Sequence, residues 1–363
     1  MSEPTPTLPE EPTSPTPTED ASAPASSIKP GLLALLTPHP FVPAPLRQHA
    51  HRLTASLTRF RAHYETQYPT RIGSLLTSLL LPTCHAALIN TYTVTPYTLP
   101  SDLPTSALPW FTTPAYTCTS TLPPPQPSPD GKRTHYLLDA ASLLPITALA
   151  PEPGMQVLDL CAAPGGKSVA IAQLLQGSGE LHVNEPDRAR RGRLKAVLNE
   201  YLGEQPSVSV RITGDDGSRV GGGGGGYDRV LVDAPCSSSR HMLQAANKAL
   251  RSGTEKGLED LLAWTPKRTA KCATLQKLLL LRALERVKVG GRVVYATCSI
   301  DDAENDGVVK AVVGKEWKGR AKIVRPKGEE EWPGERTKTG WIVLPDTGAG
   351  LGPLFFAVVV RTA

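Results

Sequence analysis

The stretch Gln156-Val-Leu-Asp-Leu-Cys-Ala-Ala-Pro-Gly-Gly-Lys-Ser168 decides the fold. Residues 156–160 predict a buried strand, and residues 168–175 predict a helix shortly after it. Between them, the adjacent glycines Gly165 and Gly166 let the backbone approach a ligand that a side chain would exclude. A P-loop is disfavoured because Cys161 stands where that motif requires glycine. The stretch therefore predicts a nucleotide-like ligand site at a strand-to-helix turn.

The chain after residue 136 alternates strands with helices. Further strands are predicted at residues 181–184, 208–213, 229–233, 292–297 and 354–360, and helices at residues 188–202 and 274–287. This alternation is typical of an α/β fold with a mostly parallel sheet and helices on both faces.

The remainder of the chain divides into two further regions. Residues 1–43, rich in Pro, Thr, Ser and Glu, predict a disordered tail. Residues 44–135 predict a small helical subdomain, with Leu53, Leu57, Phe60 and Tyr64 at helical spacing, and then a Pro-rich, aromatic-studded connection at residues 91–130 rather than regular helices or central strands. That connection is either a packed linker or a surface on which nucleobases stack. Residues 136–363 form the predicted catalytic domain.

Composition limits the classes of protein. The formal net charge is +5, and because residues 1–30 hold five acidic residues against Lys29, the remainder carries +9. A basic body fits a polyanionic partner such as nucleic acid, although ordinary basic enzymes are also common. Six cysteines without a CxxC pair predict neither a disulfide framework nor a metal site. No membrane span, signal peptide or Arg-rich transit peptide is predicted.

Polar residues follow successive strands of the predicted sheet. Glu185 is placed to accept hydrogen bonds from the hydroxyls of a ribose, and Asp216 to receive an adenine amino group. Cys236, beside Asp233, and Cys298 follow two later strands at the carboxyl edge, where open sheets place their sites. Two cysteines at strand ends beside an acid are harder to explain as packing than one buried cysteine. The six glycines Gly221 to Gly226 predict only a flexible loop insertion, because a strand rather than a helix follows them.

Five segments carry a resemblance: DLCAAPGGKS, VNEPDRARRGRL, ITGDDGSR, VLVDAPCSSSRH and VVYATCS. They resemble the successive motifs of the NOP/Sun (Fmu-like) family of S-adenosylmethionine-dependent RNA cytosine-C5 methyltransferases. Three further stretches are similar to the mitochondrial branch of that family. They are YLLDAASLLPITAL, the sequence around residues 61–72 that leads to ALIN at residues 87–90, and the SRH at residues 239–241. One departure is the run Ser237 to Ser239, where the common family pattern has a Ser-Gly or Thr-Gly step.

The resemblance implies a Rossmann-like class I methyltransferase fold that binds S-adenosyl-L-methionine and acts on RNA, either rRNA or tRNA. It implies that Cys298 is the nucleophile and that Cys236 assists release. Asp233 is the nearest candidate to protonate the cytosine ring, and Lys167 is a further catalytic candidate. The implied cofactor site comprises Cys161, Ala162, Ala163, Pro164, Gly165, Gly166, Lys167, Glu185, Asp216 and Asp233.

Several alternatives remain open at this stage. A non-catalytic RNA-binding ribosome-assembly factor could retain the same fold, while methylation of DNA or protein is disfavoured because DNA cytosine methyltransferases take their nucleophile from the PC motif. The basic residues at 188–195 are either a solvated helix face or an RNA contact. The better RNA surface is a predicted loop from Arg240 to Lys271 that contains five further cations. The family branch favours mitochondria, with the cytoplasm or nucleus as alternatives, and a protein partner could deliver the substrate.

Overall fold

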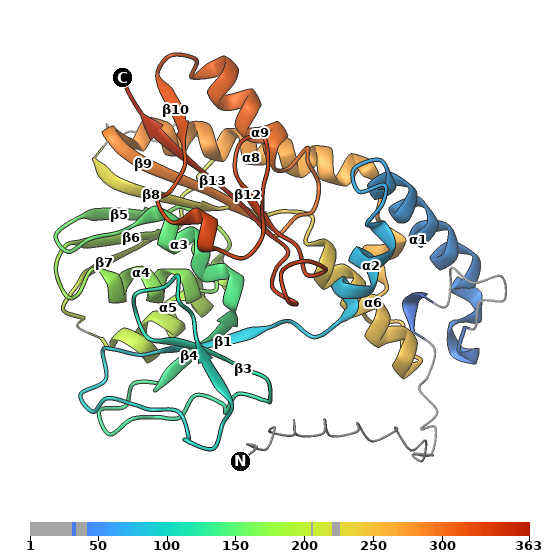
Figure 1. Cartoon of the computed structure of the whole chain (residues 1–363), viewed down its shortest axis with the longest axis horizontal. Helices are drawn as coiled ribbons and strands as arrows, with labels where there is room; N and C mark the ends of the chain where they lie inside the picture. The colour runs from blue at the N-terminus through green and yellow to red at the C-terminus, as the bar shows by residue number, and fades with distance from the viewer. Residues whose placement is uncertain (1–30, 34–41, 205, 220–225) are drawn as a thin grey trace, which may run out of the picture.

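The computed structural model describes residues 31–33, 42–204, 206–219 and 226–363. Its main sheet has the strand order β11-β12-β13-β9-β8-β5-β6-β7 (Figure 1). The parallel strands are β5 (Gln156–Asp159), β6 (Glu180–Asn184), β7 (Ser209–Thr213), β8 (Tyr227–Asp233) and β9 (Val287–Thr297). The antiparallel edge is made by β10 (Ala321–Val324), β11 (Glu335–Arg336), β12 (Trp341–Val343) and β13 (Leu354–Arg361). The predicted α/β fold is confirmed.

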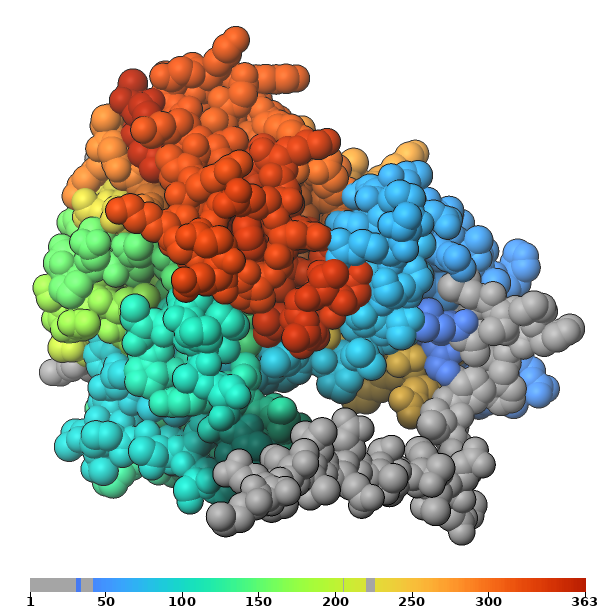
Figure 2. Space-filling view, viewed as in Figure 1, coloured from blue at the N-terminus to red at the C-terminus, as the bar shows by residue number. Residues whose placement is uncertain are grey.

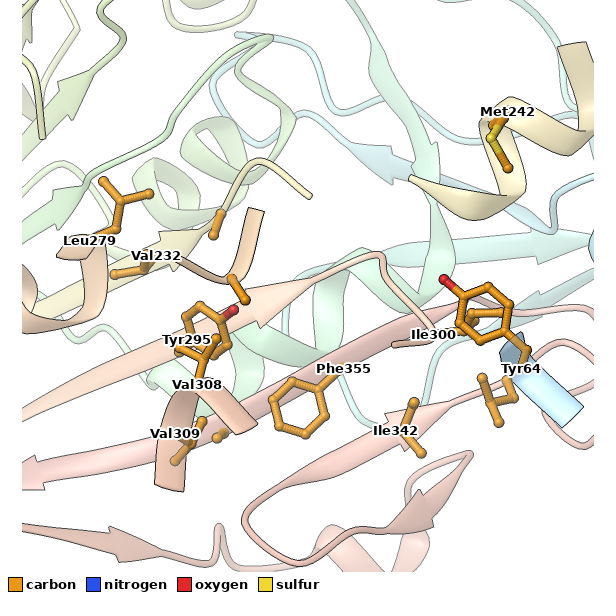
Figure 3. Close-up of a cluster of buried hydrophobic side chains, with 14 of the residues drawn as sticks. Tyr64, Val232, Met242, Leu279, Tyr295, Ile300, Val308, Val309, Ile342 and Phe355 are labelled. Atoms are coloured by element: carbon orange, nitrogen blue, oxygen red, sulfur yellow. The ribbon is translucent and has the colours of Figure 1, made fainter. Parts of the chain in front are cut away.

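Both faces of this sheet are buried. Along β8, Val230 and Val232 join one hydrophobic core, while Leu231 between them joins the other. Such alternation follows from the two-residue period of a strand. One face packs against α8 (Pro266–Arg286) and α9 (Asp306–Ala311), followed by η4 (Val312–Glu316), and the other against η3 (Ala140–Leu143), α3 (Leu144–Leu149), α4 (Gly166–Leu174) and α5 (Arg188–Leu202). Figure 3 shows Val232, Tyr295 and Phe355 in the first of these cores.

The N-terminal helices belong to the first core. η2 (Ala44–His49), α1 (Ala50–Glu65) and α2 (Ile72–Leu80) pack with α6 (Ser239–Ser252) and α7 (Glu259–Leu262) around the fully buried Trp264. Arg71 also forms ion pairs with Asp346 at 2.9 Å and Glu335 at 2.6 Å. Figure 2 shows this junction, where the blue N-terminal helices adjoin the orange-red C-terminal segment. The predicted helical subdomain therefore shares its core with the catalytic domain.

A second, smaller sheet differs from the sequence prediction. Its antiparallel order is β2-β3-β1-β4, formed by β2 (Thr105–Ala107), β3 (Ala115–Cys118), β1 (His85–Ile89) and β4 (His135–Asp139). The Pro-rich connection thus contains two short strands, which prolines tolerate because they fall outside the ladders. β4 crosses the predicted domain boundary at residue 136 and pairs with β1. The aromatic rings of the connection pack against the protein: Phe111 is buried, and Tyr92 donates to the carbonyl of Ala172.

Two further predictions need correction. Leu32, assigned to the tail, is buried and its N–H donates to Asn247 at 2.8 Å, so an ordered contact begins before residue 43; residues 1–30 and 34–41 lie outside the described residues. The segment from Arg240 to Lys271 is not a loop, because α6, α7 and the start of α8 occupy it. Of the predicted glycine insertion, only Gly226 falls within the described residues. A short η5 (Glu329–Glu331) precedes β11.

Candidate active site

A cavity of about 740 Å³ opens at the carboxyl ends of β5, β8 and β9. The chain runs from β5 outward to β6 and β7, then returns to β8 on the other side of β5, so the strand order reverses here. Open α/β sheets bind their ligands at such a switch point. Eight of the predicted site residues line this cavity: Cys161, Ala163, Lys167, Glu185, Asp216, Asp233, Cys236 and Cys298.

The two predicted cysteines lie in contact. β8 and β9 are parallel neighbours with Asp233 opposite Ala296, so the chain carries Cys236 and Cys298 out of the sheet side by side. Their Sγ atoms are 3.0 Å apart. A hydrogen bond from Cys236, together with one from Ser238 and the nearby charge of Lys167, outweighs burial and lowers the pKa of Cys298. Donation to Cys298, burial and the charge of Glu304 raise the pKa of Cys236. Cys298 is therefore the more acidic thiol of the pair.

Lys167 and Asp233 form an ion pair across the same cavity. Lys167 lies in the first turn of α4, and its Nζ donates to Asp233 Oδ2 at 2.7 Å and to Ser142 Oγ at 3.4 Å. Burial works against the charge on Lys167, but the attraction and hydrogen bond of Asp233 outweigh it, and the pKa of Lys167 is raised. The side chain of Lys167 is therefore a charged hydrogen-bond donor at the wall of the cavity.

The opposite half of the cavity fits an adenosine-like ligand. The buried carboxylate of Glu185 lines it at the end of β6, and its Oε1 accepts from the N–H of Asp187 while Oε2 pairs with Arg190 at 3.2 Å. Asp216 also lines the cavity, where it is exposed and ion-paired with Arg219 at 2.9 Å. Leu160, Leu279 and Gly217 supply apolar wall between them. A nucleoside requires polar groups that bind its hydroxyls and an apolar surface that covers its ring, and this part of the cavity offers both.

The glycine turn approaches the protein as well as the cavity. A Cβ on Gly165 would lie 2.9 Å from Val197 of α5, and one on Gly166 would lie 2.6 Å from the ring of Tyr136. Gly165 also has φ +122°, which side-chain-bearing residues rarely adopt. Ala162, Pro164 and Gly166 line an adjoining cavity of about 220 Å³, whereas Gly165 lines neither cavity. The absence of a side chain at these glycines therefore lets the turn pack closely against α5 and β4.

A buried network beneath the cysteines was missed by sequence reasoning. Glu304 accepts from the N–H of Ser237 at 3.0 Å, from Gln276 Nε2 at 2.8 Å and from Ser299 Oγ at 2.8 Å. Ser237 follows Cys236 and Ser299 follows Cys298, so one carboxylate holds both cysteine loops. Burial raises the pKa of Glu304. Only a search for acids near the TCS motif would have pointed to it.

Arg240 has a structural place that the sequence did not indicate. It was predicted to begin an RNA-binding loop, yet it is 5% exposed and its guanidinium donates to the carbonyls of Leu81 and Pro82 at 3.1 Å, and to those of Gly350 and Gly352. It thereby joins the end of α2 to the loop before β13, at the edge of the cavity. Its cationic group is occupied by backbone carbonyls, so it is not an exposed RNA contact.

The described residues contain neither a membrane-spanning helix nor a cluster of metal ligands. Within residues 31–33, 42–204, 206–219 and 226–363, no helix is long and apolar enough to cross a membrane. Across the same part of the chain, no three His, Cys, Asp or Glu side chains are grouped to hold a metal ion.

Two solved structures share this fold. The crystal structure of a methyltransferase homologue from Pyrococcus horikoshii aligns with 88% of this chain and 100% of its own at a TM-score of 0.66 and 20% identity. That of NSun6 from the same organism, with SFG, aligns with 84% of this chain and 98% of its own at a TM-score of 0.64 and 16% identity. At this identity, the likeness establishes the fold alone.

The family follows from the sequence match. The chain belongs to the 16S rRNA methyltransferase RsmB/F family, whose model matches residues 146–341, more than half of its length. The NOP/Sun resemblance is thereby confirmed.

Three named relatives show what the chain is similar to. A mitochondrial tRNA (cytosine(34)-C(5))-methyltransferase from Danio rerio is 44% identical over 50% of this chain and 46% of its own length. The 5-cytosine rRNA methyltransferase NSUN4 of Bos taurus is 33% identical over 67% of this chain and 63% of its own. A human 28S rRNA (cytosine(4447)-C(5))-methyltransferase is 38% identical over 52% of this chain and 22% of its own length. The chain thus spans between about half and two thirds of the first two relatives.

Proposed function

We propose that this chain is an RNA cytosine-5 methyltransferase that acts on rRNA or tRNA through a covalent cysteine–cytosine adduct. One observation carries the proposal: Cys236 and Cys298 lie 3.0 Å apart in the cavity that also holds the Lys167–Asp233 pair. A methyltransferase that modifies an amino group needs neither thiol, whereas carbon 5 of cytosine requires a nucleophile at carbon 6 before it can react. The names of the relatives, which act on cytosine in tRNA and rRNA, support the same substrate class.

The cavity supports S-adenosylmethionine as the cofactor. When bound, it would supply a methyl group made electrophilic by a positively charged sulfur. Glu185 would accept from the ribose hydroxyls and Asp216 from the adenine amino group, while Leu160 and Leu279 would cover the ring. Cys161, Ala163, Lys167 and Asp233 complete the wall nearest the cysteines, and the turn from Ala162 to Gly166 supports it.

Cys298 is the proposed nucleophile. Its thiolate would form a bond to carbon 6 of the cytosine, and the ring electrons would shift so that carbon 5 becomes nucleophilic and nitrogen 3 takes up a proton. The lowered pKa of Cys298, due first to the hydrogen bond from Cys236, supports this assignment over the reverse. The family resemblance makes the same choice on independent grounds.

The Lys167–Asp233 pair is the proposed source of the proton for nitrogen 3. Nζ of Lys167 carries the proton, and Oδ2 of Asp233 accepts its hydrogen bond at 2.7 Å. We assign Lys167 the supply of the proton and Asp233 its direction toward the ring.

Cys236 is the proposed release residue. After methyl transfer, a base must remove the proton on carbon 5; those electrons restore the carbon 5–carbon 6 double bond, Cys298 leaves as a thiolate, and nitrogen 3 returns its proton to Lys167. Cys236 lies 3.0 Å from the sulfur that leaves, and a hydrogen bond from its thiol would stabilise the departing thiolate.

We infer the path of the RNA from α6. His241, Gln244, Lys248 and Arg251 are spaced along one face of this helix. His241 lines the cavity, and the other three line a groove of about 460 Å³ with Leu80, Pro82, Asn247 and Ser252. The side chains of Lys248 and Arg251 are exposed at the end of this track, where they would attract backbone phosphates of nucleotides that flank the target cytosine.

The test of the function is direct. The full chain, supplied with S-adenosylmethionine carrying a labelled methyl group, should transfer label to an rRNA or tRNA pool, and bisulfite sequencing of RNA from cells that lack the protein should show the lost 5-methylcytosine. Binding of S-adenosylmethionine without transfer to any pool would favour the non-catalytic assembly factor instead.

We propose mitochondria as the compartment, because the Danio rerio relative and a Mus musculus relative of the same name are called mitochondrial. Tagging of the gene product at its C-terminus, followed by cell fractionation, tests this; recovery from the cytoplasm or nucleus would overturn it. Co-purification from the same fractions would also detect a protein partner that delivers the substrate.

A further inference from the structure

Ser238 has an unusual backbone for a serine. Its φ and ψ are both 49°, in the left-handed region that favours glycine. It is the second residue after Cys236, where the common family pattern has glycine. A side chain at this position therefore carries a conformational cost that glycine would avoid.

The hydroxyl does not do what a serine at a helix start usually does. Ser238 is the N-cap of α6, yet its side chain makes no capping hydrogen bond. Its Oγ lies instead 3.5 Å from the Sγ of Cys298 and 3.6 Å from the Sγ of Cys236, and the residue lines the cavity. Those are hydrogen-bond distances for sulfur. The left-handed backbone thus places the hydroxyl against both thiols.

We propose that Ser238 is a positioning residue for the nucleophile: its hydroxyl donates a hydrogen bond to the Cys298 thiolate and holds that sulfur toward the substrate. The proposal rests on the assignment of Cys298 made above.

The charge state of the sulfur explains why one hydroxyl can serve the whole cycle. A thiolate is the strongest acceptor within reach, so the Ser238 proton points to Cys298 while that group is charged. When Cys298 bonds to carbon, its charge is lost, and the proton can turn to the Cys236 carbonyl at 3.4 Å. When Cys298 leaves, the hydrogen bond forms again. The serine therefore stabilises the thiolate both before attack and on departure.

Nearby groups set the background against which Ser238 acts. Cys236 donates to Cys298, Lys167 attracts its negative charge, and Asp233 repels it. Burial alone would raise the pKa of the Cys298 thiol, and Ser238 is one of the groups that reverse this effect. Loss of the hydroxyl should therefore raise the pKa of Cys298 in part, while the remaining groups still allow the thiolate to form.

The experiment measures the titration of Cys298 without RNA. The full chain and its S238A and S238G variants are labelled with iodoacetamide between pH 5 and pH 10, and the Cys298 peptide is quantified by mass spectrometry. Both variants should shift the labelling midpoint upward by about one pH unit, and single-turnover methyl transfer at pH 7 should fall by about tenfold, with the difference closing at high pH. S238T, which keeps the hydroxyl, should restore the midpoint.

Two further measurements separate the explanations. S238G removes the strain together with the hydroxyl, so a shift in S238A but not in S238G would show that the backbone matters and would overturn the proposal. An unchanged midpoint in both variants would overturn it as well. S209A, at an exposed serine of β7, is the matched control and should leave the midpoint unchanged. Full methyl transfer by C298A would overturn the proposed function, whereas the labelling results would still report on the hydrogen bond.

Discussion

The carboxylate of Glu304 accepts a hydrogen bond from the backbone N–H of Ser237 at 3.0 Å, across 67 residues of chain. Because the same carboxylate accepts from Ser299 and Gln276, it fixes the spacing of the two cysteine loops. Gln276 also donates to the carbonyl of Pro235 at 2.9 Å, so the loop that carries Cys236 is held at two points. The contact between the two thiols depends on this support.

Replacement of Glu304 by alanine should therefore cost both stability and activity. It removes the shared acceptor of three buried donors; Gln276 keeps Pro235 and Ser299 keeps Ser237 as a partner, but the N–H of Ser237 is left unpaired, so the free energy of unfolding should fall by about 3 kcal/mol. Urea denaturation and methyl transfer to RNA measure the two effects. E316A, at an exposed glutamate after α9, is the control. An E304A protein as stable and active as the parent would contradict the role of this network.

Replacement of Cys298 by alanine should abolish methyl transfer, because it removes the thiol that is proposed to add to carbon 6 and leaves only Cys236, whose pKa is raised. The rate of methyl transfer should fall by at least about a thousandfold, as expected when an enzyme loses its nucleophile. The assay is transfer of a labelled methyl group to RNA, with binding of S-adenosylmethionine measured in parallel to show that the fold is intact. Undiminished transfer would remove Cys298 from the mechanism.

Replacement of Cys236 by alanine should have a different result. Addition should become slower, because the hydrogen bond that lowers the pKa of Cys298 is lost, but it should still occur. Release should be impaired more, so the variant should accumulate protein covalently attached to RNA. Denaturing gels with labelled RNA would show the slower band, which treatment with ribonuclease should remove. A C236A protein that turns over normally and forms no such band would assign Cys236 a structural role only.

The sequence was most informative where a strand ends in a polar residue. The run from residue 156 to Ser168 and the motifs at Asp233 and Cys298 each place chemistry directly after an apolar strand, and the sheet order then brings them together. The alternation of strands with helices along the chain also predicted that helices cover both faces of the sheet. These are local signals, and all of them lie in the catalytic part of the chain.

Contacts between residues far apart in the chain could not be predicted from the sequence. Nothing local shows that Glu304 accepts from Ser237, or that the charge of Arg240 is occupied by carbonyls of residues 81, 82, 350 and 352. The small sheet was missed because ten prolines hid two short strands that are stabilised by pairing with β1. Ser238 was noticed only as a departure from a pattern, since its φ is set by the turn into α6.

Asp159 should make stability depend on pH. Burial raises its pKa to about 7, although Ser168 Oγ donates to it at 2.7 Å. In the unfolded chain this carboxyl titrates near its ordinary value of about 4. Between these values the folded state holds a proton that the unfolded state has lost, so this contribution to stability is full below about pH 4 and declines as the pH rises through 7.

The D159N variant isolates this contribution. An asparagine cannot ionise and can still accept from Ser168, so its stability relative to the parent should improve between pH 5 and pH 8, by a few kcal/mol at most since three pKa units correspond to about 4 kcal/mol. Urea denaturation at both pH values gives the free energy of unfolding of the variant and the parent, and the change in their difference with pH is the quantity to compare. D102N, at an exposed aspartate, is the control. An equal pH dependence in D159N and the parent would show that Asp159 is not protonated in the folded state.

The α6 track should set affinity for RNA without setting the chemistry. K248E with R251E reverses two charges that lie about 10 and about 15 Å along the helix from His241 at the cavity, so repulsion of backbone phosphates should raise the Kd for RNA by about tenfold or more at moderate salt. The rate of a single turnover at saturating RNA should change little, because neither side chain reaches the cysteines. K315E with K318E makes the same change of charge beside α9, away from the cavity, and serves as the matched control. The loss should shrink as salt rises, since exposed charges are screened. If both double variants weaken binding equally, net charge rather than this track attracts the RNA.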